Sequence, residues 1–83
     1  MTATDTVRRV LETHGKLSTP AATLPADADL YAAGMTSHAS VNVMLAVEDA
    51  FDLEFPDELL TKSTFCSISS IANTVEALLE AAA

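Results

Sequence analysis

The sequence has few of the residues that stabilise small secreted domains or bind metals. Its 83 residues include one cysteine, which excludes an internal disulfide and therefore a disulfide-rich scaffold. Two histidines and this cysteine are scattered along the chain and do not make a structural zinc site. No apolar run approaches the roughly 18 residues of a membrane span, and the N-terminus lacks the apolar core of a signal peptide. We therefore expect a cytoplasmic domain that binds neither a metal nor a membrane.

Glycine, proline and basic residues are also scarce. Two glycines, three prolines and 49% hydrophobic residues argue against disorder. Four basic residues against twelve acidic ones give a formal charge of −8 and a pI near 4.3. This charge repels nucleic acid and favours basic protein surfaces as partners. Half of the acids lie between Glu48 and Glu58, which in a generic acidic domain is only a solvated face that aids solubility.

Apolar spacing predicts a first helix over residues 5–14, followed by a long ordered loop. Thr4 or Asp5 can cap the helix, and Gly15 stands where a left-handed residue would end it. The apolar face of the helix consists of Val7, Val10 and Leu11. Residues 16–35 show neither a helical period nor a sustained alternation, and a loop of this length tends to be functional or well packed. The side chains that could pin it to the helices are Leu17, Leu24, Leu30 and Tyr31.

Residues 37–51 form the strongest predicted helix, and they carry more apolar side chains than one buried face needs. One stripe at helical spacing consists of Val43, Met44, Val47 and Phe51, with Ser40 at its start. A second stripe beside it consists of His38, Val41 and Leu45 and ends in Glu48 and Asp52. Two explanations of the second stripe stay open: a deeply buried helix, or an exposed patch that binds a partner.

The last third of the chain predicts a short helical turn and a final helix. Pro56 can start the turn over residues 57–61, and Ser67 can cap the final helix. The buried stripe of that helix consists of Ile68, Ile71, Val75, Leu78 and Leu79. The fold class is therefore all-α: a small four-helix bundle of three main helices and one short helix, with a long first loop. We expect one domain over residues 1–83, with an ordered core of about residues 4–80.

The candidate functional site is the junction Gly34-Met35-Thr36-Ser37-His38, where the long loop meets the long helix. Gly34 allows a tight turn, and Ser37 then lies at or next to the N-cap of the helix. One interpretation is that Ser37 only caps the helix and contributes about 1 kcal/mol. The other is that its exposed hydroxyl is the attachment point of a phosphate. Free N–H groups and the positive end of the helix dipole would favour the resulting anion.

Catalysis by the chain itself is not expected. His38 follows Ser37 directly, and neighbouring helical residues point about 100° apart, so His38 is badly placed as a general base. No nucleophile elbow or oxyanion loop is visible, and pairing Ser37 with His14 would need a cleft that so small a bundle rarely has. We expect His14 to be a surface residue in the last turn of the first helix. Cys66 is predicted to be a small buried hydrophobe.

Two segments resemble the acyl carrier protein family. Residues 29–37 read Asp-Leu-Tyr-Ala-Ala-Gly-Met-Thr-Ser, and residues 48–57 read Glu-Asp-Ala-Phe-Asp-Leu-Glu-Phe-Pro-Asp. The resemblance continues through residues 65–68 and covers most of the chain. It implies that Ser37 carries 4′-phosphopantetheine from coenzyme A, and that the thiol of this arm holds a substrate as a thioester. A flexible arm raises the effective concentration of its cargo at several enzymes, so the protein needs no catalytic site.

The sequence departs from the usual carrier pattern around Ser37. Thr36 and His38 replace the Asp and Leu that most carriers have, and Ala39 and Asn42 replace acids in the first turns of the helix. Conventional carriers dock to basic patches of their partners through such acids. Docking in this protein is therefore expected to be less electrostatic at the first turns and more apolar. The expected partner-binding residues are Thr36, His38, Val41, Asn42, Leu45, Glu48 and Asp49.

The sequence is most similar to a narrower group, the bacterial aminoacyl carrier proteins. Stand-alone ligases related to the catalytic cores of class II aminoacyl-tRNA synthetases load these proteins, typically with glycine or alanine. The resemblance implies three partners for a monomeric carrier: a phosphopantetheinyl transferase, an amino acid:carrier protein ligase and a downstream acceptor enzyme. Two alternatives stay open. One is a fatty-acid or polyketide carrier with the same Ser37 chemistry, and the other is an unmodified helical interaction domain in which Ser37 is only a cap.

Overall fold

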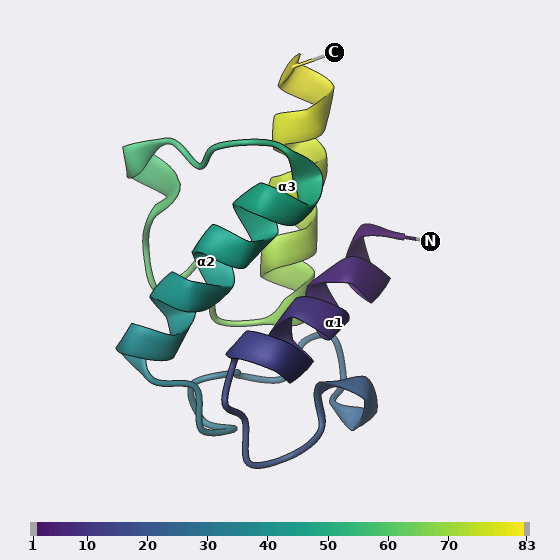
Figure 1. Cartoon of the computed structure of the whole chain (residues 1–83), viewed down its shortest axis with the longest axis vertical. Coiled ribbons are helices and arrows are strands. Elements are labelled where there is room, and N and C mark those ends of the chain that lie inside the picture. The colour runs from purple at the N-terminus through teal and green to yellow at the C-terminus, as the bar shows by residue number, and fades with distance from the viewer. Residues whose placement is uncertain (1, 83) are drawn as a thin grey trace.

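The computed structural model describes residues 2–82 and contains three α-helices joined by two long connections (Figure 1). The helices are α1 (Ala3–His14), α2 (Ser37–Phe51) and α3 (Ile68–Ala82), and the connections contain the single 3-10 turns η1 (Ala21–Thr23) and η2 (Asp57–Leu59). The all-α prediction is confirmed. The short fourth helix predicted over residues 57–61 is only the 3-10 turn η2, and η1 was not predicted. No helix in this part of the chain is both long enough and apolar enough to cross a membrane.

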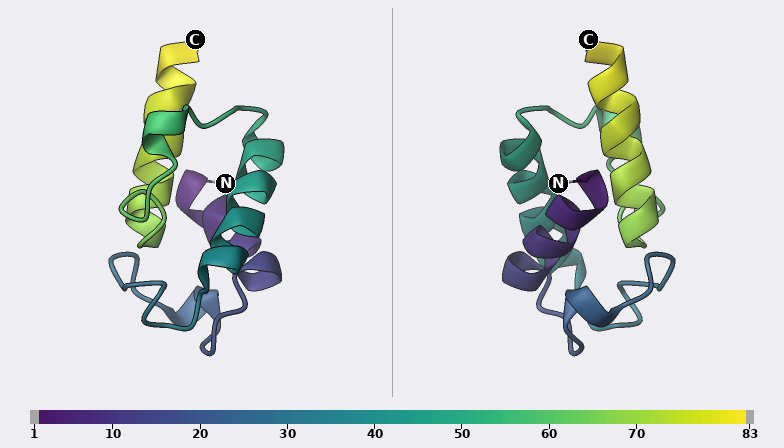
Figure 2. Two further views of the ribbon diagram at one scale, coloured as in Figure 1. Left: turned by 90° about the vertical axis from the view of Figure 1, so that its left-hand side faces the viewer. Right: turned by 90° about the vertical axis from the view of Figure 1, so that its right-hand side faces the viewer.

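The core lies where the apolar faces of the three helices meet. Helix α1 packs against both α2 and α3, and Figure 2 shows it between them from two sides. The largest fully buried side chains are Val7, Leu11, Leu30, Val43, Val47, Ile68, Ile71 and Val75. These residues confirm most of the predicted apolar face of each helix, whereas Met44, Phe51 and Leu78 are only partly buried against the core. Leu79, which was expected on the buried face of α3, is 39% exposed, and Ala72, which was not predicted to be buried, is 2% exposed.

Helix α1 begins earlier than its sequence pattern predicts. Thr2, and not Thr4 or Asp5, is the N-cap. The Thr2 hydroxyl accepts a hydrogen bond from the backbone N–H of Asp5 at 3.1 Å, and the Asp5 carboxylate accepts one from the backbone N–H of Thr2 at 3.4 Å. This reciprocal capping box satisfies two helix-end donors at once, which explains why the cap lies three residues before Asp5.

The end of α1 also differs from the prediction. Gly15 is not the left-handed residue, since its φ is −76°; the next residue, Lys16, has a φ of 52°. A glycine is needed for a different reason. A Cβ atom on Gly15 would lie 2.8 Å from the carbonyl oxygen of Leu11, to which the Gly15 N–H donates a hydrogen bond. Gly15 lies so close to the backbone of Leu11, one turn earlier in the chain, that a side chain would not fit here.

The long first loop packs against α1 and the core. The Nη1 atom of Arg8 donates hydrogen bonds to the carbonyl oxygens of Ala21 and Leu24, at 2.7 and 2.6 Å. Leu30 is fully buried in the core. Three further side chains are partly buried against the core: Leu17, Leu24 and Tyr31.

The first loop is also joined to the start of α3. The N–H of Leu30 donates to the carbonyl oxygen of Cys66 at 2.7 Å, and the N–H of Ser69 donates to that of Ala26 at 2.8 Å. Ser67 caps α3 as predicted, since its hydroxyl accepts a hydrogen bond from the N–H of Ser70 at 3.0 Å. These bonds fix the loop that leads into α2.

Candidate attachment site at the start of α2

A tight turn delivers the chain to the start of α2. Gly34 has a φ of 114°, a conformation that side chains rarely allow, which confirms the predicted turn. Its N–H donates to the carbonyl oxygen of Tyr31 at 3.2 Å, and the next N–H, that of Met35, donates to the carbonyl oxygen of Leu30 at 3.0 Å. The Met35 side chain is buried. The turn is therefore held by two backbone hydrogen bonds and by the buried side chain of Met35.

Thr36, and not Ser37, is the N-cap of α2. Its hydroxyl accepts a hydrogen bond from the backbone N–H of Ala39 at 3.0 Å. Ser37 is the first residue of the helix and its side chain is exposed. No hydrogen bond within residues 2–82 involves the Ser37 hydroxyl, whereas its carbonyl oxygen accepts one from Ser40 Oγ at 2.7 Å. The cap function therefore leaves the Ser37 hydroxyl available.

The surroundings of Ser37 fit an attached phosphate. The first turn of α2 contains no acidic residue that would repel an anion. The N-terminal N–H groups of a helix and its dipole attract negative charge. Thr36 takes up the N–H of Ala39, but other first-turn N–H groups have no partner inside the helix.

The other residues considered for chemistry do not assemble around Ser37 into a catalytic set. His14 is exposed at the end of α1, as predicted, and His38 is exposed next to Ser37. Cys66 is partly buried instead of fully buried, and its thiol donates to the carbonyl oxygen of Ser63 at 3.1 Å. Across the described residues, no group of three or more potential ligand side chains could hold a metal ion.

The second apolar stripe of α2 is exposed, which rules out the first of the two explanations left open by the sequence, a deeply buried helix. Val41 is 50% exposed and Leu45 is 53% exposed. His38 is exposed as well, and we call these three residues the apolar stripe. The buried face of α2 consists of Ala39, Val43 and Val47, and Asn42 is partly buried. The stripe therefore starts beside Ser37 and is not needed by the core.

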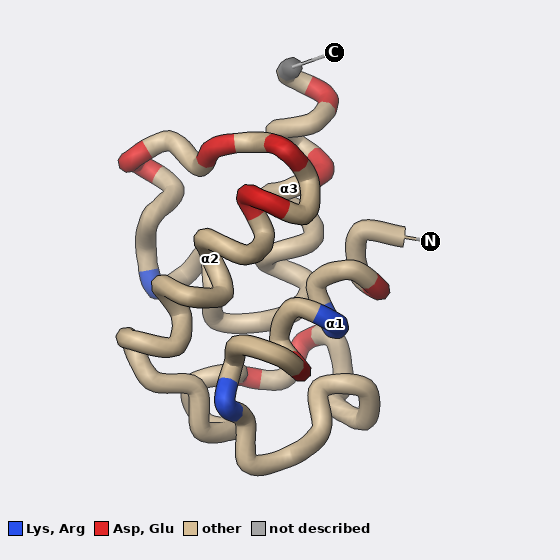
Figure 3. The backbone as a smooth tube through the Cα atoms, in the orientation of Figure 1, with Lys and Arg blue, Asp and Glu red and all other residues tan. Residues whose placement is uncertain are grey.

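The two acids expected at the docking surface have different environments. The Glu48 carboxylate accepts a hydrogen bond from the backbone N–H of Phe55 at 2.8 Å, and its side chain is partly buried. Asp49 is exposed. Figure 3 shows acidic residues gathered around the C-terminal end of α2 and the connection that follows it, away from the start of α2. Sequence reasoning missed the Phe55 bond, because a contact across a turn leaves no periodic signal.

Comparison with known proteins decides the family. The family model described as the phosphopantetheine attachment site matches residues 4–79. The chain belongs to this phosphopantetheine-attachment family. This family member is also 51% identical over 75 residues to an aminoacyl carrier protein of Agrobacterium fabrum strain C58, with 90% of each chain covered. It is a carrier protein and not an enzyme.

Solved structures show that this carrier protein has the fold of its relatives. One match is a chain in the structure of an engineered Bradyrhizobium japonicum glycine:[carrier protein] ligase complexed with carrier protein from Agrobacterium tumefaciens and AMP. This protein superposes on that chain with a TM-score of 0.85 at 51% identity. This match covers 88% of the chain and 97% of the other. A second match is a chain in the structure of the Bradyrhizobium japonicum glycine:[carrier protein] ligase complexed with glycylated carrier protein. There the TM-score is 0.74 at 28% identity, and the match covers 87% of this chain and 96% of the other.

Proposed function

We propose that Ser37 is the phosphopantetheine attachment residue and that the arm carries glycine as a thioester. The observation that supports this most directly is the division of roles at the start of α2, where Thr36 caps the helix and the Ser37 hydroxyl stays exposed. A hydroxyl that already accepted a capping bond would be held against the backbone. The free hydroxyl of Ser37 can instead reach into the active site of another protein.

The attachment reaction uses the Ser37 oxygen as the nucleophile. The hydroxyl loses its proton to a base of the phosphopantetheinyl transferase, and its Oγ forms a bond to the phosphorus next to the pantetheine of coenzyme A. The phosphoanhydride bond breaks, and adenosine 3′,5′-bisphosphate leaves. The attached group supplies a thiol that holds the cargo as a thioester. The start of α2 contributes N–H groups and a dipole that stabilise the phosphodiester anion.

The proposed cargo rests on the relatives. A relative at 51% identity is an aminoacyl carrier protein, and the carrier in the complex with the Bradyrhizobium japonicum ligase is glycylated. We infer that a glycine:carrier protein ligase loads this protein as well. A transferase acts before the ligase, and an acceptor enzyme removes the glycyl group afterwards.

The apolar stripe is the proposed docking surface for the ligase. It lies on the same helix as Ser37 and extends eight residues from it, slightly more than two turns, and both Val41 and Leu45 expose about half of their surface. Thr36 precedes the helix as its N-cap, Asn42 follows Val41 along it, and the exposed Asp49 adds negative charge one turn beyond Leu45. A partner with an apolar surface and basic residues beside it would match this arrangement.

The test is the intact mass of the protein after incubation with coenzyme A and a broad-specificity transferase. We expect the gain of one phosphopantetheine in the wild type and in Ser40→Ala, and no gain in Ser37→Ala. Ser40 is the matched control because it is a second serine in the first turn of α2. An unmodified wild-type protein with several transferases would contradict the proposal and favour a helical interaction domain.

The cargo is tested with the modified protein. Offered glycine, ATP and a glycine:carrier protein ligase, it is expected to gain the mass of one glycyl group. Offered malonyl coenzyme A and a fatty-acid loading enzyme, it is expected to gain nothing. The reverse result would make it a carrier of the fatty-acid or polyketide type with the same Ser37 chemistry.

A further inference from the structure

Lys62 is a basic residue in an otherwise acidic part of the chain. Three of the four bases lie within the first 16 residues, and Lys62 is the only base after them. Its side chain is exposed, and its ammonium lies over the ring of Tyr31, 4.9 Å from the ring centre. Asp57 and Glu58 are near in sequence, but no ion pair joins Lys62 to an acid within residues 2–82. The positive charge of Lys62 is therefore available to another anion.

Tyr31 belongs to the turn that leads to Ser37, so its ring connects Lys62 with the attachment site. The Asp29 carboxylate accepts hydrogen bonds from the backbone N–H groups of Tyr31 and Ala32, at 2.9 and 3.3 Å. The carbonyl oxygen of Tyr31 accepts one from the N–H of Gly34 at 3.2 Å. These bonds hold the backbone that carries the ring. The face of the ring attracts the cation and thereby restricts the long lysine side chain.

The backbone of Tyr31 lies within about 12 Å of that of Ser37. The N–H of Met35 donates at 3.0 Å to the carbonyl oxygen of Leu30, which belongs to the peptide bond before Tyr31. The backbone from the Met35 nitrogen to the Ser37 nitrogen is two residues long and spans at most about 7 Å. Figures 1 and 2 show the connection between α2 and α3 running alongside α2 toward its start. The Lys62 side chain is about 6 Å long, and a phosphate on Ser37 extends about 4 Å from the backbone, so the two groups can meet across this gap.

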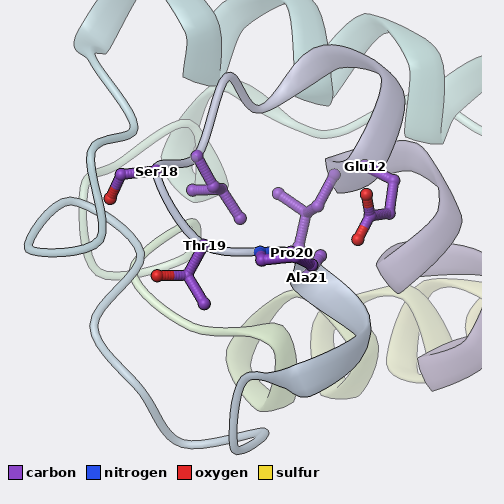
Figure 4. A pocket seen from close by; sticks show the side chains of 7 residues that line it. Glu12, Ser18, Thr19, Pro20 and Ala21 are labelled. Carbon is purple, nitrogen blue, oxygen red and sulfur yellow. The ribbon is translucent and has the colours of Figure 1, made fainter.

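The other lysine approaches the same turn from the first loop. The carbonyl oxygen of Lys16 lies 3.7 Å from the position that a Cβ atom on Gly34 would take. Ser18 holds this contact, since its N–H and its hydroxyl both donate to the carbonyl oxygen of Ala33, at 2.9 and 2.7 Å. Figure 4 shows Ser18 and Glu12 on opposite sides of an open cavity of about 240 Å³ between the end of α1 and the first loop. In the described part of the chain no aromatic ring holds the Lys16 ammonium, so only one of the two lysines is held in place.

We propose that Lys62, held on the ring of Tyr31, is the counter-charge of the phosphodiester in the attached arm. The proposal rests on the proposed function, since the phosphodiester exists only when Ser37 carries the arm. An ammonium has three donors and the ring covers one side of it, so N–H groups remain for the phosphate oxygens. The first turn of α2 contains no acid that would compete for Lys62. The pairing directs the start of the arm toward the connection between α2 and α3.

The expected pairing is weak, which suits an arm that must move between enzymes. Lys62 and Ser37 are both exposed, and exposed ion pairs change an equilibrium only about two- to fivefold. Added salt screens such a pair. Lys62 is favoured over Lys16 because a side chain that is already held loses less freedom when it pairs. The pairing therefore orders the first atoms of the arm and leaves its thiol end free.

The first experiment follows the side-chain ammonium signals of the isotope-labelled full chain before and after attachment of the arm, which intact mass verifies first. The chain has two lysines, so Lys16 serves as the internal reference. The Lys62 signal is expected to shift farther than the Lys16 signal on attachment, and this shift is expected to shrink as salt is added. Equal shifts, no shift, or a shift that salt leaves unchanged would overturn the proposal. A protein that gains no arm would contradict the proposed function instead, so the two failures are distinct.

The second experiment measures how much attachment of the arm changes the melting temperature in two variants. In Lys62→Gln this change is expected to be less favourable than in the wild type by about 1–5 °C, because the phosphodiester has lost its counter-charge. Lys16→Gln removes the same charge beside the same turn and should keep most of the wild-type change. Comparing modified with unmodified protein within each variant cancels a merely structural effect of the substitution. Equal changes in the two variants would overturn the pairing with Lys62.

Discussion

The hydroxyl of Thr36 accepts a hydrogen bond from the backbone N–H of Ala39 at 3.0 Å, so the cap of α2 is a different residue from the proposed site of modification, Ser37. The sequence resemblance places Thr36 where carriers are expected to have an aspartate, and a threonine side chain can supply the same kind of acceptor. Threonine does so without a negative charge next to the serine. The start of α2 is therefore capped by Thr36, has no acidic residue in its first turn, and leaves the Ser37 hydroxyl free.

Thr36→Ala is expected to lower the free energy of unfolding by about 1 kcal/mol, because the N–H of Ala39 loses its acceptor. Ser37→Ala is expected to change it by less than about 0.5 kcal/mol, since an exposed side chain without such a bond is removed. Urea denaturation of the unmodified proteins checks both values. Thr36→Ser is the control and should retain most of the stability. A larger loss in Ser37→Ala than in Thr36→Ala would show that the cap has been assigned to the wrong residue.

Arg8→Met is expected to destabilise the protein by about 1–3 kcal/mol, because it removes a charged donor from the carbonyl oxygens of Ala21 and Leu24. Arg9→Met removes the same charge from an exposed position one residue away and should change stability by about 0.5 kcal/mol or less. Thermal unfolding of the two variants provides the measurement. Similar melting temperatures would mean that Arg8 does not hold the first loop.

Glu48→Ala is expected to lower stability by about 1 kcal/mol, because the Phe55 N–H loses its acceptor across the turn after α2. Glu48→Gln keeps an acceptor oxygen and should lose less. Asp49→Ala should leave stability nearly unchanged, since Asp49 is exposed. Chemical denaturation of the three variants distinguishes these effects. If Glu48→Ala left the stability unchanged, both Glu48 and Asp49 would be available for docking.

Val41→Asp is expected to reduce the rate of loading by a glycine:carrier protein ligase at least about tenfold, because it places a charge in an apolar contact. Its stability should hold, since the side chain is already half exposed. Loading kinetics at several salt concentrations make the measurement. Asp49→Lys should slow loading less, and this loss should shrink as salt rises. Wild-type loading of Val41→Asp would rule out the apolar stripe as the docking surface.

Gly15→Ala is expected to destabilise the protein by more than about 1 kcal/mol, although the φ of Gly15 suits any residue. The added Cβ would lie 2.8 Å from the backbone carbonyl oxygen of Leu11, which cannot move without opening the end of α1. Ala22→Gly provides a comparison at an exposed position in η1. The melting temperature is the readout, and a stable Gly15→Ala would show that the helix end relaxes easily.

Much of the fold could be predicted because burial leaves a periodic signal. Val7, Val43 and Ile71 lie at helical spacing with their neighbours, and all three are fully buried. The errors concern features that have no period. Thr2 caps α1 through a reciprocal pair of bonds, and Leu79 lies on the exposed side because only packing decides how far a stripe extends.

By itself, the sequence predicted an all-α domain and, through its resemblance to carrier proteins, the proposed attachment at Ser37, because helix periodicity and the Gly-x-x-Ser junction are both local patterns. Only the tertiary structure decided which side of α2 faces solvent. Val43 and Val41 are equally apolar, but α1 packs against α2 and buries the first while the second stays half exposed. Tertiary contacts also decided the role of Glu48 and formed the cavity beside Glu12, since both join residues whose proximity depends on how the chain folds back.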